Sequence, residues 1–236
     1  MKPNAGKSIQ TIVLVGGDKG GVGKSTVTRT LVDYYQQEKV DFIAYDGDDT
    51  NPTFTRFYGR AERLSTRTPK GFEPLIANLE GGPAVQLVDL GAGSSMMLAE
   101  FTEATGFLYL AQEHGAKVTF VFVLAPTVDS INLLKILSEQ YGDQIRYIVA
   151  RNQAMPGNWD LWEKSKTRAS VLGDLGGIEL TIPRLDEAAF AVVDRLGLPW
   201  GEALQKREVT LVTRSYVFRW RQKVFAELAK AQEVLR

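Results

Sequence analysis

A glycine- and lysine-rich segment near the start of the chain has the residue types that hold phosphate groups. Residues 16–26 read Gly-Gly-Asp-Lys-Gly-Gly-Val-Gly-Lys-Ser-Thr. Glycines let consecutive backbone amides curl around an anion, Lys24 can reach terminal phosphates, and the Ser25 hydroxyl can bind magnesium. A second lysine, Lys19, precedes the usual one. The segment predicts a nucleotide-binding loop whose contacts come from Gly20, Gly21, Val22, Gly23, Lys24, Ser25 and Thr26.

The flanking residues predict the elements that position this loop. Residues 11–15 form an apolar, β-branched run without polar alternation, which is typical of a parallel strand buried on both faces. After the loop, apolar residues recur at helical spacing, namely Val27, Leu31, Val32 and Tyr35. A strand, a glycine loop and a helix would point the positive N-terminus of that helix at a phosphate.

The run from Lys19 to Ser25 resembles the signature of the deviant Walker A ATPases of the ParA and MinD type. In that family the signature lysine reaches the phosphates bound by the partner subunit. The resemblance implies that ATP or ADP binds with Mg²⁺, and that ATP holds two copies of the chain together as a homodimer. A lysine donated in trans would neutralise the charge of two facing nucleotides, and hydrolysis would loosen the dimer.

An acidic segment at residues 46–49, Asp-Gly-Asp-Asp, follows an apolar run and resembles the second motif of the family. By that match Asp46 supports the metal and lysine region, and Asp48 positions the attacking water. The family often has proline where this chain has Asp49, so the choice between Asp48 and Asp49 stays open. A solvated acidic turn at a strand end is the alternative interpretation.

Residues 85–93, Val-Gln-Leu-Val-Asp-Leu-Gly-Ala-Gly, resemble the Walker B strand and the switch that follows it. By resemblance, Asp89 holds a magnesium-bound water. Carboxylates at the carboxyl ends of neighbouring parallel strands converge on one crevice, so Asp46 and Asp89 are expected near Ser25 as the metal site. Gly91 and Gly93 would let the switch approach or release the γ-phosphate.

Two later segments resemble the family's base-binding region. Residues 147–152 look like the strand that ends in the base-contacting asparagine, here Asn152, whose amide can both donate to and accept from adenine. Pro183 belongs to the segment that lines the base pocket. An asparagine after a strand is also a common turn residue, so both interpretations of Asn152 stay open.

Several short motifs indicate a branch within the family. They look most like the TraL branch found with plasmid conjugation systems, with the StbB plasmid-stability proteins nearby. The resemblance spans nearly the whole chain and is more specific for the ATPase core than for the branch. The branch motifs occur at residues 46–54, 89–95, 182–185 and 211–214.

Composition favours one cytoplasmic domain over residues 1–236. The chain is 44% hydrophobic, with no apolar stretch of membrane-spanning length and no apolar targeting segment at its start. It has no cysteine, which excludes disulfides and the thiolate ligands of nitrogenase-like iron proteins, iron–sulfur carriers and arsenite pumps. Its single histidine, His114, makes a zinc cluster implausible.

The alternation of apolar runs predicts an α/β fold of the three-layer P-loop NTPase type, with a mostly parallel sheet covered by helices on both faces. Tryptophans 159 and 162, near the proposed base pocket, are expected in the core. Strands are expected near residues 10–16, 40–46, 85–89, 117–125, 146–151 and 178–182, and helices near 24–38, 96–112 and 129–141.

Charge gives few indications about partners. The chain carries 28 basic and 28 acidic residues, so it lacks the overall positive field of a DNA-coating protein. Basic residues gather at 56–70 and 206–223; we favour a solvated face, with non-specific DNA binding as the alternative. Residues 216–235 place an apolar stripe on one helix, which we interpret as a core helix, so membrane attachment is not expected.

These patterns predict an ATP-dependent dimerisation switch that hydrolyses ATP slowly and recruits or places a macromolecular partner, in plasmid conjugation, partition or maintenance. Lys19, Lys24 and Asp48 would serve catalysis. A P-loop metabolic ligase or amidase of the dethiobiotin or cobyrinic-acid synthase type is one alternative, which Lys19 and the lack of a separate substrate domain argue against. A module that binds nucleotide without hydrolysing it is the other.

Overall fold

The computed structural model describes residues 10–17, 20–49 and 52–236. The strands are β1 (Thr11–Gly17), β2 (Phe42–Gly47), β3 (Glu62–Arg63), β4 (Val85–Leu90), β5 (Lys117–Leu124), β6 (Arg146–Asn152) and β7 (Ile178–Ile182). The helices are α1 (Lys24–Glu38), α2 (Thr53–Phe57), α3 (Glu73–Ala77), α4 (Ser94–Thr105), α5 (Phe107–Glu113), α6 (Val128–Tyr141), α7 (Asp160–Glu163), α8 (Lys166–Ala169), α9 (Glu187–Arg195), α10 (Trp200–Ala203), α11 (Leu211–Ala229) and α12 (Gln232–Leu235). Short turns of other helix types are η1 (Pro69–Phe72), η2 (Gly142–Gln144) and the π-helical η3 (Ser170–Asp174).

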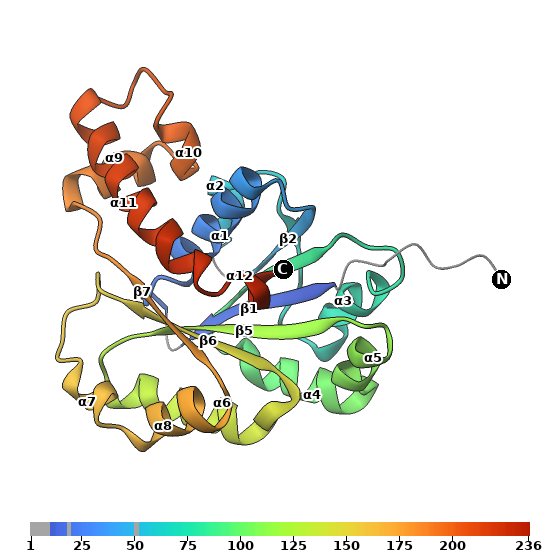
Figure 1. The fold of residues 1–236 in the computed structure, drawn as a ribbon. Helices are drawn as coiled ribbons and strands as arrows, with labels where there is room; N and C mark the ends of the chain where they lie inside the picture. The colour runs from blue at the N-terminus through green and yellow to red at the C-terminus, as the bar shows by residue number, and fades with distance from the viewer. Residues whose placement is uncertain (1–9, 18–19, 50–51) are drawn as a thin grey trace.

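The strands form one parallel sheet in the order β3-β2-β4-β1-β5-β6-β7 (Figure 1). The parallel register confirms the predicted sheet, and each expected strand is present. The first strand lies in the middle, between β4 and β5, because the chain builds β2, β3 and β4 on one side of it and then crosses over it to β5. In such sheets, ligands bind in the crevice at the carboxyl ends of the strands where the winding direction changes.

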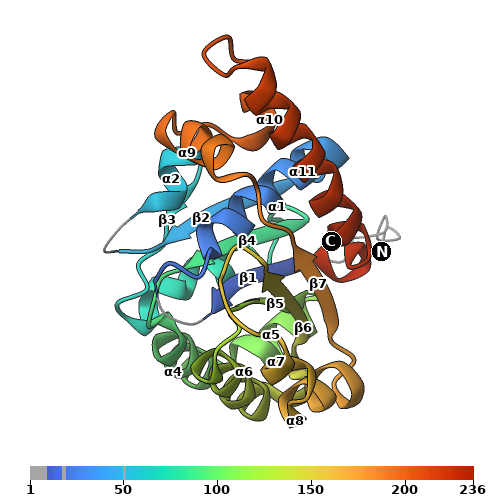
Figure 2. The same cartoon turned by 90° about the vertical axis from the view of Figure 1, so that its left-hand side faces the viewer.

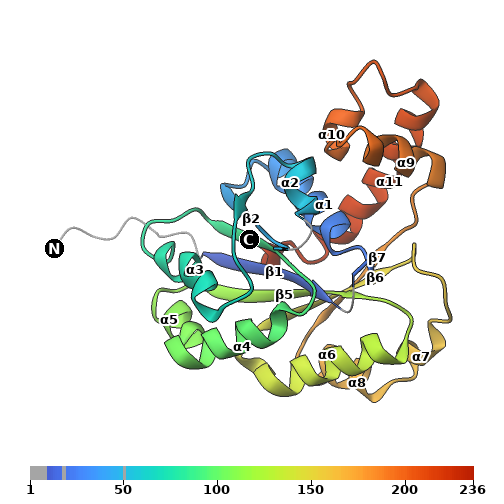
Figure 3. The same ribbon diagram turned by 180° about the vertical axis from the view of Figure 1, so that it is seen from behind.

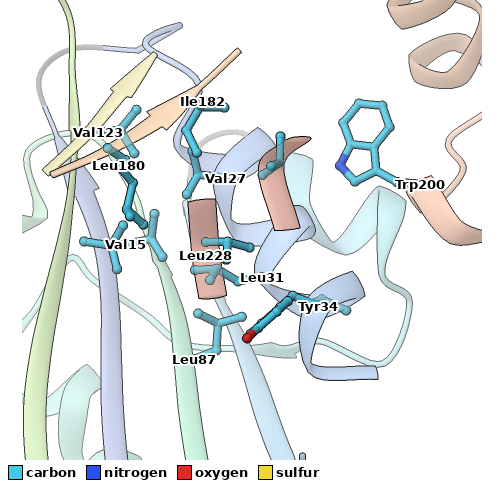
Figure 4. Packing of buried hydrophobic residues seen from close by; sticks show 14 of the residues in the cluster. Val15, Val27, Leu31, Tyr34, Leu87, Val123, Leu180, Ile182, Trp200 and Leu228 are labelled. Carbon is cyan, nitrogen blue, oxygen red and sulfur yellow. The ribbon is translucent and has the colours of Figure 1, made fainter. Parts of the chain in front are cut away.

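Helices cover both faces of the sheet, and each face has its own apolar core (Figures 1 and 3). Side chains alternate along β1, so Val13 and Val15 pack toward α1 and α11, whereas Ile12 and Leu14 pack toward α4 and α6. Figure 4 shows the first of these cores, where residues of the central strands meet Val27 and Leu31 of α1. Both faces of the central strands are therefore buried, as their unbroken apolar sequence predicted.

The predicted helix over residues 96–112 is two helices in the structure. Helix α4 ends at Thr105 and α5 begins at Phe107, with Gly106 between them at φ 64°. This left-handed conformation is one that glycine adopts without a steric cost, and it caps α4 while redirecting the chain. The sequence expectation was wrong here because it followed apolar spacing and ignored this one glycine.

Residues 187–220, comprising α9, α10 and the first half of α11, form a C-terminal lobe that rises from one side of the sheet (Figures 1 and 2). The rest of α11 returns along the sheet. The apolar stripe predicted for this helix is buried, namely Val217, Trp220, Val224 and Leu228, which confirms it as a core helix. Within the residues that the structure describes, no helix has the length and apolar character needed to cross a bilayer.

Candidate active site

The phosphate loop joins β1 to α1, as expected. Gly21 and Gly23 have φ values of 87° and 99°, and Gly23 caps α1 without any side-chain hydrogen bond to the helix start. Helix α1 thus begins within the loop, so the positive end of its dipole lies where an anion would bind. A Cβ added at Gly20 or Gly21 would meet no atom within 4 Å, so this side of the loop is open. Lys19 lies outside the described residues.

Two carboxylates lie beside the loop, because Asp46 of β2 and Asp89 of β4 are direct neighbours in the register of the sheet. Asp89 also pairs with Val15 of β1, two residues before the end of that strand. Asp46 is fully buried and Asp89 is 2% exposed. The sheet thus brings both predicted carboxylates to the edge from which the phosphate loop leaves.

Asp89 contacts the first turns of α1. Its Oδ1 accepts a hydrogen bond of 2.7 Å from the Thr28 hydroxyl, and the Ser25 hydroxyl is a second donor. Burial raises the pKa of Asp89 to about 7, and hydrogen bonds from Ser25 and Thr28 oppose this shift. Thr28 was missed by sequence reasoning, although it follows Lys24 by four residues and therefore shares its helix face.

Asp46 shapes the acidic segment that follows it. Its Oδ1 accepts from the backbone N–H of Asp48 at 3.1 Å, and its Oδ2 accepts from both the N–H and the hydroxyl of Thr55 at 2.8 and 2.7 Å. Both oxygens of this carboxylate are therefore engaged, and they tie the segment and helix α2 to the end of β2. Arg63 adds a long ion pair at 3.9 Å.

The two remaining aspartates of the segment differ in their surroundings. Asp49 accepts from the backbone N–H of Thr66 at 2.7 Å and from the Ser65 hydroxyl at 3.3 Å, so its carboxylate holds the loop after β3. Asp48 lies against the predicted switch, where the Gly91 backbone approaches so closely that an added Cβ would lie 3.1 Å from the Asp48 Cα. Asp48 and residues 91–94 line a cavity of about 310 Å³ that Asp49 also borders.

A second cavity of about 310 Å³ lies next to the phosphate loop and below the C-terminal lobe. Asn152 and Pro183 line it, as the base-pocket interpretation requires, together with Thr26. Sequence reasoning missed most of the apolar walls, because they come from segments that are far apart in the sequence and meet only in the fold. These walls include Met155, Ile182, Leu185, Phe190 and Trp220.

The Asn152 side chain forms hydrogen bonds to the backbone, as a turn residue does. Its Nδ2 donates to the carbonyl of Val22 at 2.7 Å, and its Oδ1 accepts from the N–H of Ala154 at 3.0 Å. This amide therefore fixes the phosphate loop to the end of β6, and one N–H and one lone pair are left for another contact. Trp162 is fully buried, as expected of a core residue, whereas Trp159 is only partly buried; neither lines the cavity.

The donor set suits a hard, water-bearing cation. Magnesium prefers oxygen ligands and usually keeps several waters, with one or two protein groups and the substrate phosphates completing its shell. Ser25 and Asp89 supply such oxygens, and a cation would favour the ionised form of the buried Asp89. Among the described residues no cluster of three or more acidic or histidine side chains could hold a metal by itself, so phosphate oxygens and water would have to contribute.

Known proteins resemble this chain along most of its length. No family model matches it. The chain is 24% identical over 217 residues to Protein MobD of Acidithiobacillus ferrooxidans, covering 90% of this chain and 93% of that protein. It is also 24% identical over 232 residues to Protein TraL of Escherichia coli, covering 90% and 95%.

Solved structures show the fold. The septum site-determining protein MinD from Pyrococcus horikoshii, complexed with Mg-ADP, superposes with a TM-score of 0.53 at 15% identity, over 97% of this chain and 99% of that one. A ParA family ATPase from Chlorobium tepidum gives 0.54 at 15% identity, over 92% and 99%. The chain therefore has the fold of the MinD and ParA ATPases, as its sequence motifs predicted, and TraL is among its relatives.

Proposed function

We propose that this chain binds Mg·ATP at the carboxyl end of the sheet and hydrolyses it slowly. The observation that carries the proposal is the convergence of three groups at one edge: the open phosphate loop, the Ser25–Asp89–Thr28 cluster and the acidic segment at Asp48. The Mg-ADP complex of the Pyrococcus MinD protein, which has the same fold, supports this choice of ligand.

Each residue has a role in this proposal. Lys24 and the backbone amides of residues 20–26 would hold the phosphates, while the Ser25 hydroxyl and a water held by Asp89 would complete the magnesium shell. Thr28 would orient Asp89. Asp46 would support the acidic segment, and Asp48 would hold the attacking water. The position of Asp48 against the Gly91 backbone favours Asp48 over Asp49 for that task.

The cavity lined by Asn152 and Pro183 would receive the nucleobase. The free N–H and lone pair of Asn152 match the donor and acceptor pattern of adenine. The apolar walls would cover the faces of the base, and burial of flat aromatic surface would add affinity without selecting the sugar or the phosphates.

The role in the cell follows from the relatives and is likewise proposed. ATP would join two copies of the chain through Lys19, and the dimer would place or recruit a macromolecular partner in plasmid conjugation, partition or maintenance. The matches to Protein MobD and Protein TraL over nine-tenths of the chain support this assignment. A protein partner fits it best, with non-specific DNA as a second ligand.

Nucleotide binding and phosphate release test the enzymatic part directly. We expect the native protein to bind a fluorescent ATP analogue in the presence of Mg²⁺ and to release phosphate with multiple turnovers. Lys24→Ala should weaken binding by 10-fold or more, because it removes the charge that faces the phosphates. The exposed Lys135→Ala on α6 serves as the control and should behave as native. A native protein that binds no nucleotide would refute the proposal.

A further inference from the structure

Arg29, on the helix that follows the phosphate loop, is a buried cation with few partners. Its side chain is 2% exposed, and its guanidinium carbon lies 3.8 Å from the ring centre of Phe57 and 3.5 Å from that of Trp200. The guanidinium is thus held flat between two aromatic rings. Within the described residues none of its three nitrogens has a hydrogen-bond acceptor, and the nearest carboxylate oxygen, on Asp194, is 3.7 Å away.

This arrangement costs stability. Burial lowers the pKa of Arg29 to about 9. Stacking on two rings offsets only part of the free energy that the guanidinium loses when water is removed from it. A contrast lies one turn further along the same helix, where Asp33 accepts hydrogen bonds from Nε and Nη2 of Arg221 and so joins α1 to α11. The charged contact of Asp33 with α11 is thus hydrogen-bonded, whereas that of Arg29 with Asp194 of the C-terminal lobe is not.

Phe57, one of the two rings that contact Arg29, is connected to the acidic segment through α2. Phe57 is the last residue of α2, and Thr55 on the same short helix donates two hydrogen bonds to Asp46, which in turn holds the N–H of Asp48. The neighbouring Arg56 donates to both oxygens of Asp194 at 3.1 Å. A shift of Phe57, which lies against the Arg29 guanidinium, would therefore be passed to Asp46 and Asp48 through α2.

Trp200, the other ring that contacts Arg29, is connected to the apolar cavity through Trp220. Trp200 donates from Nε1 to the Thr30 hydroxyl at 3.0 Å, and its ring lies 4.8 Å from that of Trp220. Trp220 lines the cavity and donates to the Pro183 carbonyl at 2.6 Å. Figure 4 shows Trp200 reaching from the C-terminal lobe toward α1. Arg29 is thus the junction between the cavity walls and the acidic segment.

We propose that Arg29 is a positioning residue. Occupation of the apolar cavity brings Asp194 into hydrogen-bond contact with Arg29. This contact draws the C-terminal lobe and α2 together and so holds Asp48 in position. The unpaired guanidinium favours this movement because it has no hydrogen bond to lose and at least one to gain. A closure of less than about 1 Å would suffice, since a charged hydrogen bond is roughly 2.8 Å long. The inference rests on the proposed nucleotide site.

The test uses Arg29→Met, which fills the slot between the rings without charge, and Arg195→Met as its control on an exposed position of α9. We expect Arg29→Met to bind the fluorescent ATP analogue within about 3-fold of native and to release phosphate at least 10-fold more slowly. Nucleotide should change the tryptophan emission of the native protein and not that of Arg29→Met. Arg29→Lys should behave like Arg29→Met, because an ammonium group cannot stack as a planar guanidinium does.

Stability separates positioning from a structural role. Without nucleotide, Arg29→Met should unfold at a urea concentration equal to or above that of native, whereas a structural role predicts a lower midpoint. Asp194→Asn should reproduce the slow phosphate release, and Arg56→Gln, which removes only the exposed partner of Asp194, should not. Native turnover and a native emission change in Arg29→Met or in Asp194→Asn would overturn the inference. A native protein without nucleotide binding would instead refute the underlying function.

Discussion

The two halves of the candidate site are built by different means. The phosphate half consists of backbone amides at the start of α1 and carboxylates at the ends of adjacent strands, all within residues 20–94. The apolar half consists of side chains from the ends of β6 and β7, the loops that follow them, α9 and α11, which meet only through the fold. Charge and hydrogen bonds define the first half, and apolar contact area defines the second. Substitutions in the two halves should therefore affect different steps.

Asp48→Ala should have the largest effect, and only on hydrolysis. Loss of the residue proposed to hold the attacking water should slow phosphate release by roughly 10²-fold while nucleotide affinity stays near native. Single-turnover phosphate release, measured beside nucleotide binding, separates the two quantities.

Asp49→Ala is the matched control for this prediction. It should leave the rate of the folded protein near native and lower the free energy of unfolding by about 1–3 kcal/mol, because the N–H of Thr66 loses its acceptor. If Asp49→Ala releases phosphate slowly and Asp48→Ala does so at the native rate, Asp49 is the water-positioning residue and Asp48 is not.

Asp89 should make the metal-free protein sensitive to pH. Its pKa is about 7 in the folded protein against an ordinary value of 3.8, so the folded state holds the proton more tightly than the unfolded state. The stability that this proton contributes is complete at low pH and is lost as pH rises through about 7. Asp89→Asn should gain about 2 kcal/mol relative to native between pH 5.5 and pH 8.

Urea unfolding of native and Asp89→Asn in a chelator, at the two pH values, measures this gain. An equal difference between the two proteins at both pH values would mean that Asp89 is already ionised in the folded protein. The Asp89 carboxylate would then be more accessible to water than its burial in the structure indicates.

Met155→Ala should have the smallest effect, and it should separate the two halves. The substitution removes apolar contact from the cavity, which should weaken ATP binding by about 1 kcal/mol, or roughly 5-fold. Binding of inorganic triphosphate should not change, because it needs only the phosphate half. Competition against a fluorescent ATP analogue gives both affinities. An equal loss for both ligands would show that the two halves are not independent.

The same contrast explains what the sequence could predict. The phosphate loop, Asp46 and Asp89 lie in short motifs whose spacing carries the chemistry, and the β-branched runs before them predicted the central strands. The two-residue strand β3 and the short helices α2, α7, α8 and α10 were not predicted, because four or five residues give too little periodicity.

The apolar half depended on tertiary contacts that no local pattern reports. Trp220 read as one member of a core stripe, and only the packing of α11 against β7 shows that its ring also borders the cavity. Phe190 and Met155 carried no signal at all. Thr28 is different, since its four-residue spacing from Lys24 was visible in the sequence.

The proposed function depends on ATP joining two copies of this chain. Light scattering of native protein and Lys19→Ala, each with magnesium and either ATP or ADP, tests it most directly. We expect the native protein to form a dimer with ATP only, and Lys19→Ala to lose the dimer while it still binds nucleotide. If the native protein stays monomeric with ATP and Lys19→Ala cannot be distinguished from it, the dimer switch is refuted and the chain is only a nucleotide-binding protein.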